Sequence, residues 1–223
     1  MIIDSQSKLP VTGLIIAQDE EKYIHKAIMN LRPNVKEVIV IDGGSKDRTV
    51  EIAKNLKCRV EHRKFDFDFS AQRNFGIECV TTEWVLWLDA DEYFDEHVYD
   101  VIPTLCMKSD KNVSAYQFYR RSIFDGRRVD NDEDFQWRLT RKGGCVWDGK
   151  IHEGLRHLDG FIGKRLPKEF ILFHEHSMAR QLYNNKLYWG INNGVTRRPG
   201  DLEGSEYRDT EGKWVDVPTD RNA

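Results

Sequence analysis

Two carboxylates separated by one residue, Asp89 and Asp91, follow an apolar run in the segment WVLWLDADEYF. Carboxylates this close repel one another unless a positive charge lies between them. Mg²⁺ or Mn²⁺ meets that need, because these cations bind one or two carboxylates and complete their shell with phosphate oxygens and water. The pair therefore predicts a divalent cation site, with an acidic turn of no chemical role as the alternative.

The elements that position this loop alternate between strand and helix. Short apolar runs predict strands, and apolar residues at helical spacing predict helices, with Asp47 as the N-cap of the second helix. The predicted strands are 11–17, 37–41, 58–62 and 84–88, and the predicted helices are 18–31, 46–56 and 70–82. Such alternation implies a parallel sheet, in which ligands collect at the carboxyl ends of the strands. The loops that begin at Ala17, Asp42 and Asp89 are therefore the expected site.

The pattern changes in the second half of the chain. After a helix at 96–107, the sequence predicts strands at 116–124 and 135–141, an apolar run at 171–173 and a helix at 179–191. Without crossover helices between the strands, we expect a mixed or antiparallel arrangement there. Residues 196–223 are polar and glycine-rich, which is typical of a flexible tail.

Composition excludes several classes of protein. The net charge of −3 gives no general attraction to nucleic acid or anionic lipid, and 39% apolar with 32% charged residues is a globular balance. The four cysteines are widely spaced, as in a protein of a reducing compartment. No signal peptide and no apolar run of about 20 residues is recognisable. We expect a cytoplasmic protein, either free or peripheral to the inner face of a membrane.

Four segments occur in an order that resembles family 2 glycosyltransferases of the GT-A fold, especially the small bacterial type that adds sugars to lipopolysaccharide cores. They are VTGLIIAQDEEKYI, EVIVIDGGSKDRTVEIA, FSAQRNFGIECVTTEWVLWLDADE and VWDGKIHEGL. The resemblance implies an α/β, Rossmann-like fold with a mostly parallel central sheet and a smaller mixed or antiparallel part. We expect one domain over 1–195, divided into a nucleotide-sugar half (10–92) and an acceptor half (93–195), and then the tail (196–223).

The resemblance also implies donor contacts. The matching positions are Ala17, Gln18, Glu20, Asp42, Gly43, Arg73, Asp89 and Ala90. A carboxylate at Asp42 can accept hydrogen bonds from a base or ribose, although it could equally shape the turn before Gly43. Gln18 stands where the family often has an aromatic residue. Arg73 suits a diphosphate, because a guanidinium binds phosphate oxygens with two parallel hydrogen bonds; a surface ion pair is the alternative.

For the metal, the resemblance adds a late histidine to the acidic pair. The implied ligands of Mn²⁺ or Mg²⁺ are Asp89, Asp91 and His174, which fits the family spacing better than His176.

A carboxylate base is implied as well, because these enzymes remove the proton of the acceptor hydroxyl and invert the anomeric centre. DNDEDFQWRL offers Glu133 and Asp134, and GKIHEGL offers Glu153 beside His152. We favour Glu153 and keep Asp134 as the second candidate.

The predicted reaction moves a hexose from a nucleotide diphosphate sugar, a UDP-sugar first, to a hydroxyl acceptor. The basic residues between Arg120 and Lys142 would suit a phosphorylated saccharide core or a modified nucleic acid, and ion-paired surface strands are the alternative. A sugar nucleotidyltransferase is a competing function, but the first loop, AQDEEKY, lacks the glycines that such enzymes use. A non-catalytic nucleotide- or carbohydrate-binding module is the other.

Overall fold

The computed structural model describes residues 9–129, 134–192, 207–208 and 214–215. Its helices are α1 (Ile24–Leu31), α2 (Thr49–Asn55), α3 (Phe69–Cys79), α4 (Glu96–Lys108) and α5 (Met178–Asn192), with a 3₁₀ turn at Arg32–Asn34. Its strands are β1 (Val11–Ala17), β2 (Glu37–Asp42), β3 (Arg59–His62), β4 (Trp84–Asp89), β5 (Glu92–Phe94), β6 (Val113–Phe124), β7 (Arg127–Val129), β8 (Phe135–Arg141), β9 (Cys145–Asp148), β10 (Gly154–His157), β11 (Ile162–Arg165), β12 (Ile171–His176), β13 (Tyr207–Arg208) and β14 (Trp214–Val215).

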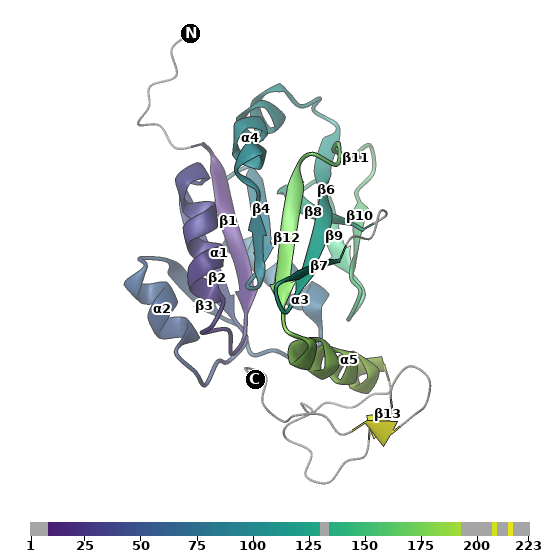
Figure 1. Cartoon of the computed structure of the whole chain (residues 1–223). Coiled ribbons are helices and arrows are strands. Elements are labelled where there is room, and N and C mark those ends of the chain that lie inside the picture. The colour runs from purple at the N-terminus through teal and green to yellow at the C-terminus, as the bar shows by residue number, and fades with distance from the viewer. Residues whose placement is uncertain (1–8, 130–133, 193–206, 209–213, 216–223) are drawn as a thin grey trace.

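One mixed sheet organises the fold (Figure 1), with its strands in the order β3-β2-β1-β4-β8-β6-β12-β5. The first four of these strands are parallel and are joined by α1, α2 and α3. Strands covered on both faces read as continuous apolar runs, which is why the sequence predicts β1, β2 and β4 well. In this register Ala17 lies beside Asp42, and Ile16 lies beside Asp89, so the three expected loops meet at one end of the sheet.

The second half of the chain completes the sheet without crossover helices. β8 runs antiparallel to both β4 and β6, whereas β12 runs parallel to β6. The short strand β5 pairs antiparallel with β12 and places His174 opposite Glu92. The expected α/β fold, with a parallel half and a mixed second half, is confirmed.

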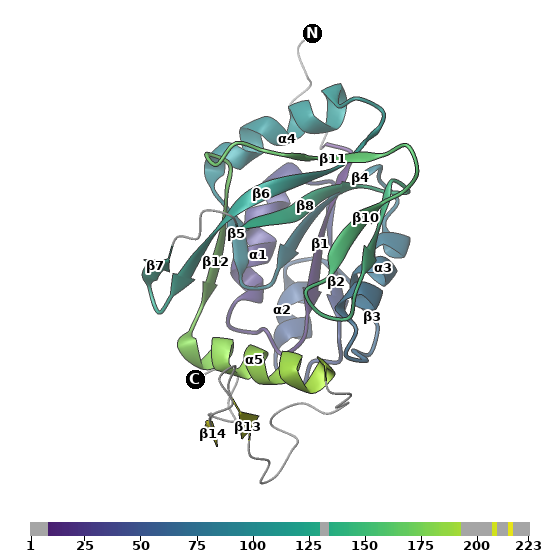
Figure 2. The same cartoon turned by 90° about the vertical axis from the view of Figure 1, so that its right-hand side faces the viewer.

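Helices cover the two faces of the sheet (Figure 2). α1 buries its four predicted apolar residues, Ile24, Ala27, Ile28 and Leu31, in the main core. Each of the three larger side chains contributes roughly 1.5–3 kcal/mol on burial. On the other face, α3 packs so closely on β1 that a Cβ on Gly76 would lie 2.9 Å from the Leu14 side chain.

α1 begins at Ile24, six residues later than the predicted start at 18. The intervening backbone is held by the loop after β2. The amides of Asp19, Glu20 and Glu21 donate to the side chains of Ser45, Thr49 and Asp47. The prediction that Asp47 is the N-cap of α2 is wrong, because Arg48 holds that position. Asp47 instead connects the two loops through hydrogen bonds to the amides of Glu21 and Thr49.

Several short elements have no counterpart in the prediction. β9 and β10 form a hairpin, and the loop between them carries His152 and Glu153.

α5 lies across the end of the sheet where β1 and β12 finish (Figures 1 and 2). In the tail, β13 pairs with β14, and the rest of 196–223 is outside the described residues. None of the helices in the described part combines the length and apolar character needed to cross a bilayer.

Candidate functional site

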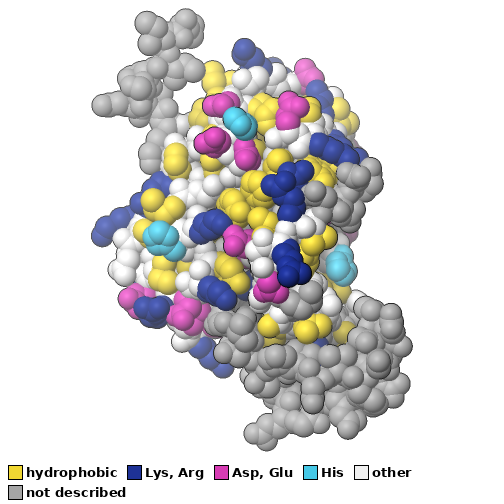
Figure 3. Space-filling view, in the orientation of Figure 1, with side chains coloured by type: hydrophobic (Ala, Val, Ile, Leu, Met, Phe, Trp, Pro, Cys, Tyr) yellow, Lys and Arg dark blue, Asp and Glu magenta, His cyan; other side chains and the backbone are white. Residues whose placement is uncertain are grey.

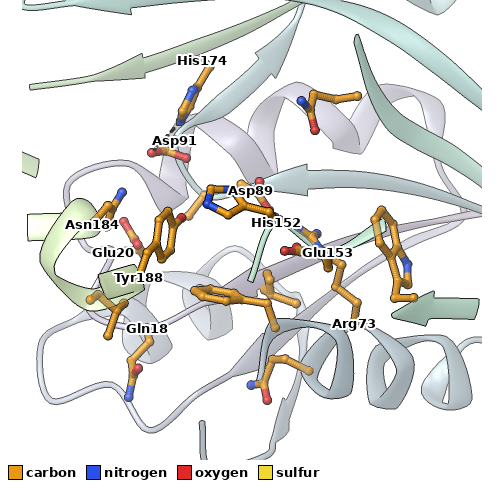
Figure 4. Close-up of a pocket in the computed structure, with 18 of the residues that line it drawn as sticks. Gln18, Glu20, Arg73, Asp89, Asp91, His152, Glu153, His174, Asn184 and Tyr188 are labelled. Atoms are coloured by element: carbon orange, nitrogen blue, oxygen red, sulfur yellow. Dashed lines mark hydrogen bonds and ion pairs between the residues drawn. The ribbon is translucent and has the colours of Figure 1, made fainter. Parts of the chain in front are cut away.

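The predicted site residues surround a cavity of about 550 Å³ at the carboxyl end of the parallel strands, under α5 (Figure 4). All of them line it except Asp42 and Asp134. The lining residues among them are Ala17, Gln18, Glu20, Gly43, Arg73, Asp89, Ala90, Asp91, Glu153 and His174. The loops that the strand-end rule selects therefore converge on one cavity.

Asp89 is held between two arginines. One carboxylate oxygen accepts from Arg73 Nη2 at 2.8 Å, and the other accepts from Arg138 Nη2 at 2.9 Å. Burial opposes ionisation of Asp89, but the two guanidinium groups outweigh it and lower the pKa to about 2. Asp89 is therefore an anion whose two oxygens are both engaged.

Glu92 continues this network into the core. Its side chain is fully buried and accepts two hydrogen bonds from Arg138, each 2.7 Å long, and one from the Asp89 amide at 3.0 Å. Arg138 is only 2% exposed. It is thus not part of the basic outer face predicted for residues 120–142, because its charge is used inside the protein.

Glu153 reaches the same network from the loop after β9. Its Oε1 accepts from Arg73 Nε at 2.6 Å, so Arg73 binds Glu153 and Asp89 at the same time. The loop makes a sharp bend at His152, whose φ is 49°. A left-handed conformation at a non-glycine residue costs energy and occurs more often at functional sites than elsewhere.

Asp91, His174 and His176 form a group of potential metal ligands, which we call the metal cluster. Their ligand atoms lie within 4.8 Å of one another. His174 Nε2 is 3.2 Å from Asp91 Oδ2 and 3.0 Å from His176 Nδ1. A carboxylate with two imidazoles is a suitable donor set for Mn²⁺. The predicted ligand Asp89 is not among these three residues, and each of its oxygens accepts from an arginine; His176 joins the predicted Asp91 and His174.

The charge state of the metal cluster follows from its surroundings. Burial and the neighbouring His174 lower the pKa of His176 to about 4, so this imidazole is neutral. For His174, burial acts in the same direction, but Asp91 outweighs it and raises the pKa. Burial also opposes ionisation of Asp91, and Arg180 and His174 reverse that effect and lower its pKa. In Figure 4, His174 points directly at Asp91.

Arg180, on α5, is a site residue that the sequence reasoning missed. Its Nη1 and Nη2 donate to the two oxygens of Glu20, both at 2.6 Å, and its Nε lies 3.0 Å from Asp91 Oδ2. The signal was the helical spacing of Arg180 with Tyr183, Leu187 and Ile191, since a charged residue on a buried stripe needs a partner. Glu20, predicted as a donor contact, lines the cavity, and both of its carboxylate oxygens accept from this arginine.

Asp42 shapes the turn that follows β2. It is 3% exposed and accepts hydrogen bonds from the amides of Gly44 and Ser45, at 3.0 and 3.1 Å. His62, at the end of the neighbouring strand, contacts it through Nδ1 at 3.1 Å. Of the two interpretations offered by the sequence, this geometry favours the turn, because Gly43 rather than Asp42 reaches the cavity.

The cavity wall next to Gly43 is aromatic. The Gln18 side chain donates to the Gly43 carbonyl at 2.8 Å, and a Cβ on Gly43 would lie 3.2 Å from both Gln18 and Phe65. Phe65 and Phe69 line the cavity, with ring centres 4.8 Å apart. Neither ring was among the predicted site residues, and together they supply the aromatic surface that Gln18 does not.

Asp134, the second candidate base, lies outside the cavity lining. Its two oxygens accept from Arg120 Nε and Gln136 Nε2, both at 2.8 Å. Glu133 lies outside the described residues. The position of the carboxylates therefore favours Glu153 as the group that can reach a substrate.

The network as a whole carries excess negative charge. Arg120, 4.0 Å from Glu92, is itself paired with Asp134 and does not change this balance. In the ion pairs described above, five carboxylates share three guanidinium groups: Glu20, Asp89, Asp91, Glu92 and Glu153 with Arg73, Arg138 and Arg180. The carboxylates of these pairs therefore outnumber the guanidinium groups by two, and His174, whose pKa Asp91 raises, offsets one of these charges when it is protonated.

α5 forms the outer wall of the cavity. Tyr183 and Tyr188 line it, as does Asn184, whereas Trp189 is 47% exposed. Tyr188 packs against His152 with the ring centres 5.3 Å apart, so α5 touches the loop that carries Glu153. Burial raises the pKa of Tyr188 to about 12, which keeps the phenol protonated. Tyr188 can therefore donate a hydrogen bond at neutral pH.

Comparison with other sequences gives related proteins. Residues 14–187 match the family model described as Glycosyl transferase family 2. The chain is 27% identical over 190 residues to the lipopolysaccharide core biosynthesis glycosyltransferase LpsC of Rhizobium meliloti, covering 81% of this chain and 69% of LpsC. It is 35% identical over 155 residues to the SPbeta prophage-derived glycosyltransferase SunS of Bacillus subtilis, covering 64% of this chain but only 34% of SunS.

Solved structures share the fold. TarS of S. aureus in complex with UDP-GlcNAc aligns with a TM-score of 0.57 at 13% identity, covering 86% of this chain and 68% of that chain. Glucosyl-3-phosphoglycerate synthase of Mycobacterium tuberculosis, in complex with Mn²⁺, UDP and phosphoglyceric acid, aligns with a TM-score of 0.55 at 12% identity, covering 95% and 87%. The structural alignments establish the common fold, and at identities this low they establish nothing about the ligands of this chain.

Proposed function

Because the chain belongs to glycosyltransferase family 2, we propose that it transfers a hexose from a UDP-sugar to a hydroxyl acceptor, with inversion and with the help of Mn²⁺ or Mg²⁺. The observation that carries this proposal is the placement of the metal cluster, Arg73 and Glu153 around one cavity. The pairing of a cation site with a separate carboxylate is what a single displacement at an anomeric carbon requires.

Asp91, His174 and His176 would hold the cation, which neutralises the charge that develops on a departing nucleoside diphosphate. The excess of carboxylates over guanidinium groups in the site supports this assignment. If the site carried no excess negative charge, lysine or arginine side chains alone could neutralise the diphosphate, and no cation would be needed. Arg73 contributes a fixed positive charge on the other side of Asp89.

The nucleotide end of the donor fits the wall formed by Gln18, Gly43 and Phe65. A glutamine amide can pair with the edge of a pyrimidine, and a phenylalanine ring can stack on its face. In this proposal Asp42 acts on the donor through the turn that it holds, by fixing the position of Gly43. UDP is the first nucleotide to test, because both solved structures compared above contain uridine nucleotides.

Glu153 is the proposed base. Among the described residues, only Arg73 donates to its carboxylate, through Oε1, so Oε2 remains available. Glu153 takes the proton of the acceptor hydroxyl while the hydroxyl oxygen forms a bond to the anomeric carbon. The bond from that carbon to the diphosphate oxygen breaks on the opposite face, which inverts the configuration. Arg73 fixes the orientation of Glu153 by its second hydrogen bond, to Asp89.

The acceptor side of the cavity is lined by Gln117, Arg120, Phe135, Gln136 and Trp137. Aromatic rings with amide groups are typical of saccharide binding, and the relative LpsC acts in lipopolysaccharide core biosynthesis. A saccharide acceptor is thus favoured over nucleic acid. Three basic residues of this region are ion-paired: Arg120 with Asp134, Arg138 with Glu92, and Arg141 with Glu83. Basic and acidic side chains are interspersed on the face seen in Figure 3.

We also propose that residues 10–92 and 93–195 act as one catalytic unit. The first half supplies Arg73, Asp89 and Asp91, whereas the second supplies Glu153 and the two histidines of the metal cluster. Neither half contains a complete site. A polypeptide of the first half alone is therefore expected to lack metal-dependent nucleotide binding.

Calorimetric titration tests this function. UDP, GDP, TDP and CDP are each titrated with and without Mn²⁺, on the wild type and on Asp91→Asn. One nucleotide should bind in a metal-dependent manner to the wild type and lose that dependence in the variant. Binding of no nucleotide in either condition would show that the acidic loop is structural. The anomeric configuration of the product, determined by NMR, then decides between inversion and retention.

A further inference from the structure

Arg180 lies against the metal cluster from the side of α5. Its Nε is 3.0 Å from Asp91 Oδ2, the same oxygen that faces His174 Nε2 at 3.2 Å. This oxygen belongs to the ligand set of the cluster. A dication bound there and a guanidinium at this distance from the same oxygen would repel one another strongly, because the site is buried and screening is weak.

The contact of Arg180 with Asp91 is the weaker of its two attachments. Its Nε makes no directed hydrogen bond with any described residue, although it lies within ion-pair distance of Asp91. Its Nη1 and Nη2, by contrast, each donate to Glu20 at 2.6 Å. Arg180 can therefore leave Asp91 without becoming an unpaired buried charge, since Glu20 still neutralises it.

Arg180 also faces the cavity that the donor would occupy. It lines that cavity together with Asn184 and Tyr188 of the same helix, and its side chain is only 6% exposed. A guanidinium suits phosphate oxygens better than an ammonium does, because its donors form a planar fork. A small shift away from Asp91 would leave Nε pointing into a space that a diphosphate can fill.

We propose that Arg180 is the counter-ion of Asp91 until a divalent cation binds, and that it then becomes a ligand of the donor diphosphate while it stays bound to Glu20. This inference rests on the proposed function, since it needs a metal and a nucleotide at this site. It assigns to one residue two effects of opposite sign. Arg180 opposes binding of the metal alone, and it favours binding of the diphosphate once the metal is present.

The test measures both effects on Arg180→Ala. Binding of Mn²⁺ without nucleotide is followed by the loss of the EPR signal of the free ion, and its Kd should fall by about tenfold or more. Binding of UDP at saturating Mn²⁺ is measured by calorimetry, and its Kd should rise roughly tenfold to a hundredfold, as for a lost hydrogen bond to a charged group. Uridine, which has no phosphate, should bind the variant and the wild type equally.

Three further variants control for structure and charge. Arg180→Lys keeps the charge, so its Mn²⁺ affinity should stay near that of the wild type. Glu20→Gln removes the stronger attachment, so that Asp91 becomes the main charge partner of Arg180. Mn²⁺ should therefore bind this variant more weakly than the wild type, whereas it should bind Arg180→Ala more tightly. Lys186→Ala removes a charge from the same helix at a position that does not line the cavity, and both affinities should be unchanged.

The outcomes separate the inference from the proposed function. If the wild type binds Mn²⁺ and UDP but Arg180→Ala weakens both, Arg180 only anchors α5, and the exchange on Asp91 is wrong. If neither the wild type nor Arg180→Ala binds Mn²⁺, the metal site fails and the inference fails with it. Should Arg180→Ala not fold, Mn²⁺ binding to the other two variants decides the question: it should weaken in Glu20→Gln and stay near that of the wild type in Arg180→Lys.

Discussion

Arg73 binds Asp89 and Glu153 simultaneously, through Nη2 at 2.8 Å and Nε at 2.6 Å. The two carboxylates come from opposite halves of the chain, one at the end of β4 and the other in the loop after β9. A single planar guanidinium therefore sets the distance between the acidic loop and the proposed base. Such positioning raises the reaction rate, because small displacements of a reacting group slow the reaction considerably.

The first prediction concerns Arg73→Lys. An ammonium keeps the charge but cannot hold both carboxylates in one plane. Transfer should fall roughly a hundredfold, as for a misplaced catalytic group, while Mn²⁺ affinity changes little, because Arg73 does not contact the metal cluster. Steady-state kinetics and EPR of Mn²⁺ measure the two quantities. Arg59→Lys, at an exposed ion pair with Glu61, is the matched control and should behave as the wild type.

The second prediction concerns Glu153→Gln. The amide is similar in size but cannot take a proton, so transfer should fall by about a hundredfold or more while UDP still binds in the presence of Mn²⁺. Single-turnover transfer assays and calorimetry measure the two properties. Asp134→Asn is the matched comparison and should remain active. If Asp134→Asn is inactive and Glu153→Gln is not, Asp134 is the base.

The sequence predicted those parts of the fold in which a local pattern reflects burial. The parallel strands β1, β2 and β4 are buried on both faces and appear as apolar runs, and α1 shows its four core residues at helical spacing. Short strands such as β11 were missed, because three of its four residues are exposed and its sequence has no apolar pattern. The mixed order of the later strands followed only from the lack of crossover helices.

The lining of the cavity was predictable where a polar residue follows the apolar residues of a strand, as Asp89, Asp91 and His174 do. It was not predictable where a charge finds its partner far along the chain. Arg180 and Glu20 are 160 residues apart, and Arg138 and Glu92 are 46 apart. The alternation of side chains along a strand places Arg138 on one face of β8, but only the fold shows that this face contacts Glu92.

The third prediction concerns the ligands of the metal. His176→Ala should weaken Mn²⁺ binding by at least about tenfold, since even groups that only orient a ligand typically contribute that much. Asp91→Asn should abolish binding, and His25→Ala, at an exposed position of α1, should have no effect. EPR titration of Mn²⁺ measures all three. Loss of binding in Asp89→Asn combined with normal binding in His176→Ala would restore the adjacent acidic pair as the metal site.

The fourth prediction is the pH dependence of stability due to Asp89. Burial raises the pKa of this carboxyl group, but Arg73 and Arg138 outweigh burial and lower the pKa from 3.8 to about 2. A carboxyl group with a lowered pKa stabilises the fold fully above its unfolded value, and this contribution is lost as the pH falls through its folded value. The shift corresponds to about 2 kcal/mol at neutral pH.

The measurement compares the urea unfolding free energy of the wild type and Asp89→Asn at several pH values. The wild type should be more stable by about 2 kcal/mol at pH 7, and the difference should shrink as the pH falls from about 4 towards 2.

Asp66→Asn is the control. A hydrogen bond from Arg63 lowers the pKa of Asp66 as well, against the smaller effect of burial, but the Asp66 side chain is 58% exposed. An exposed pair contributes little, roughly 0–1 kcal/mol. A difference for Asp89→Asn that stays constant down to pH 2 would mean that the asparagine perturbs packing, and that the charge of Asp89 does not stabilise the network.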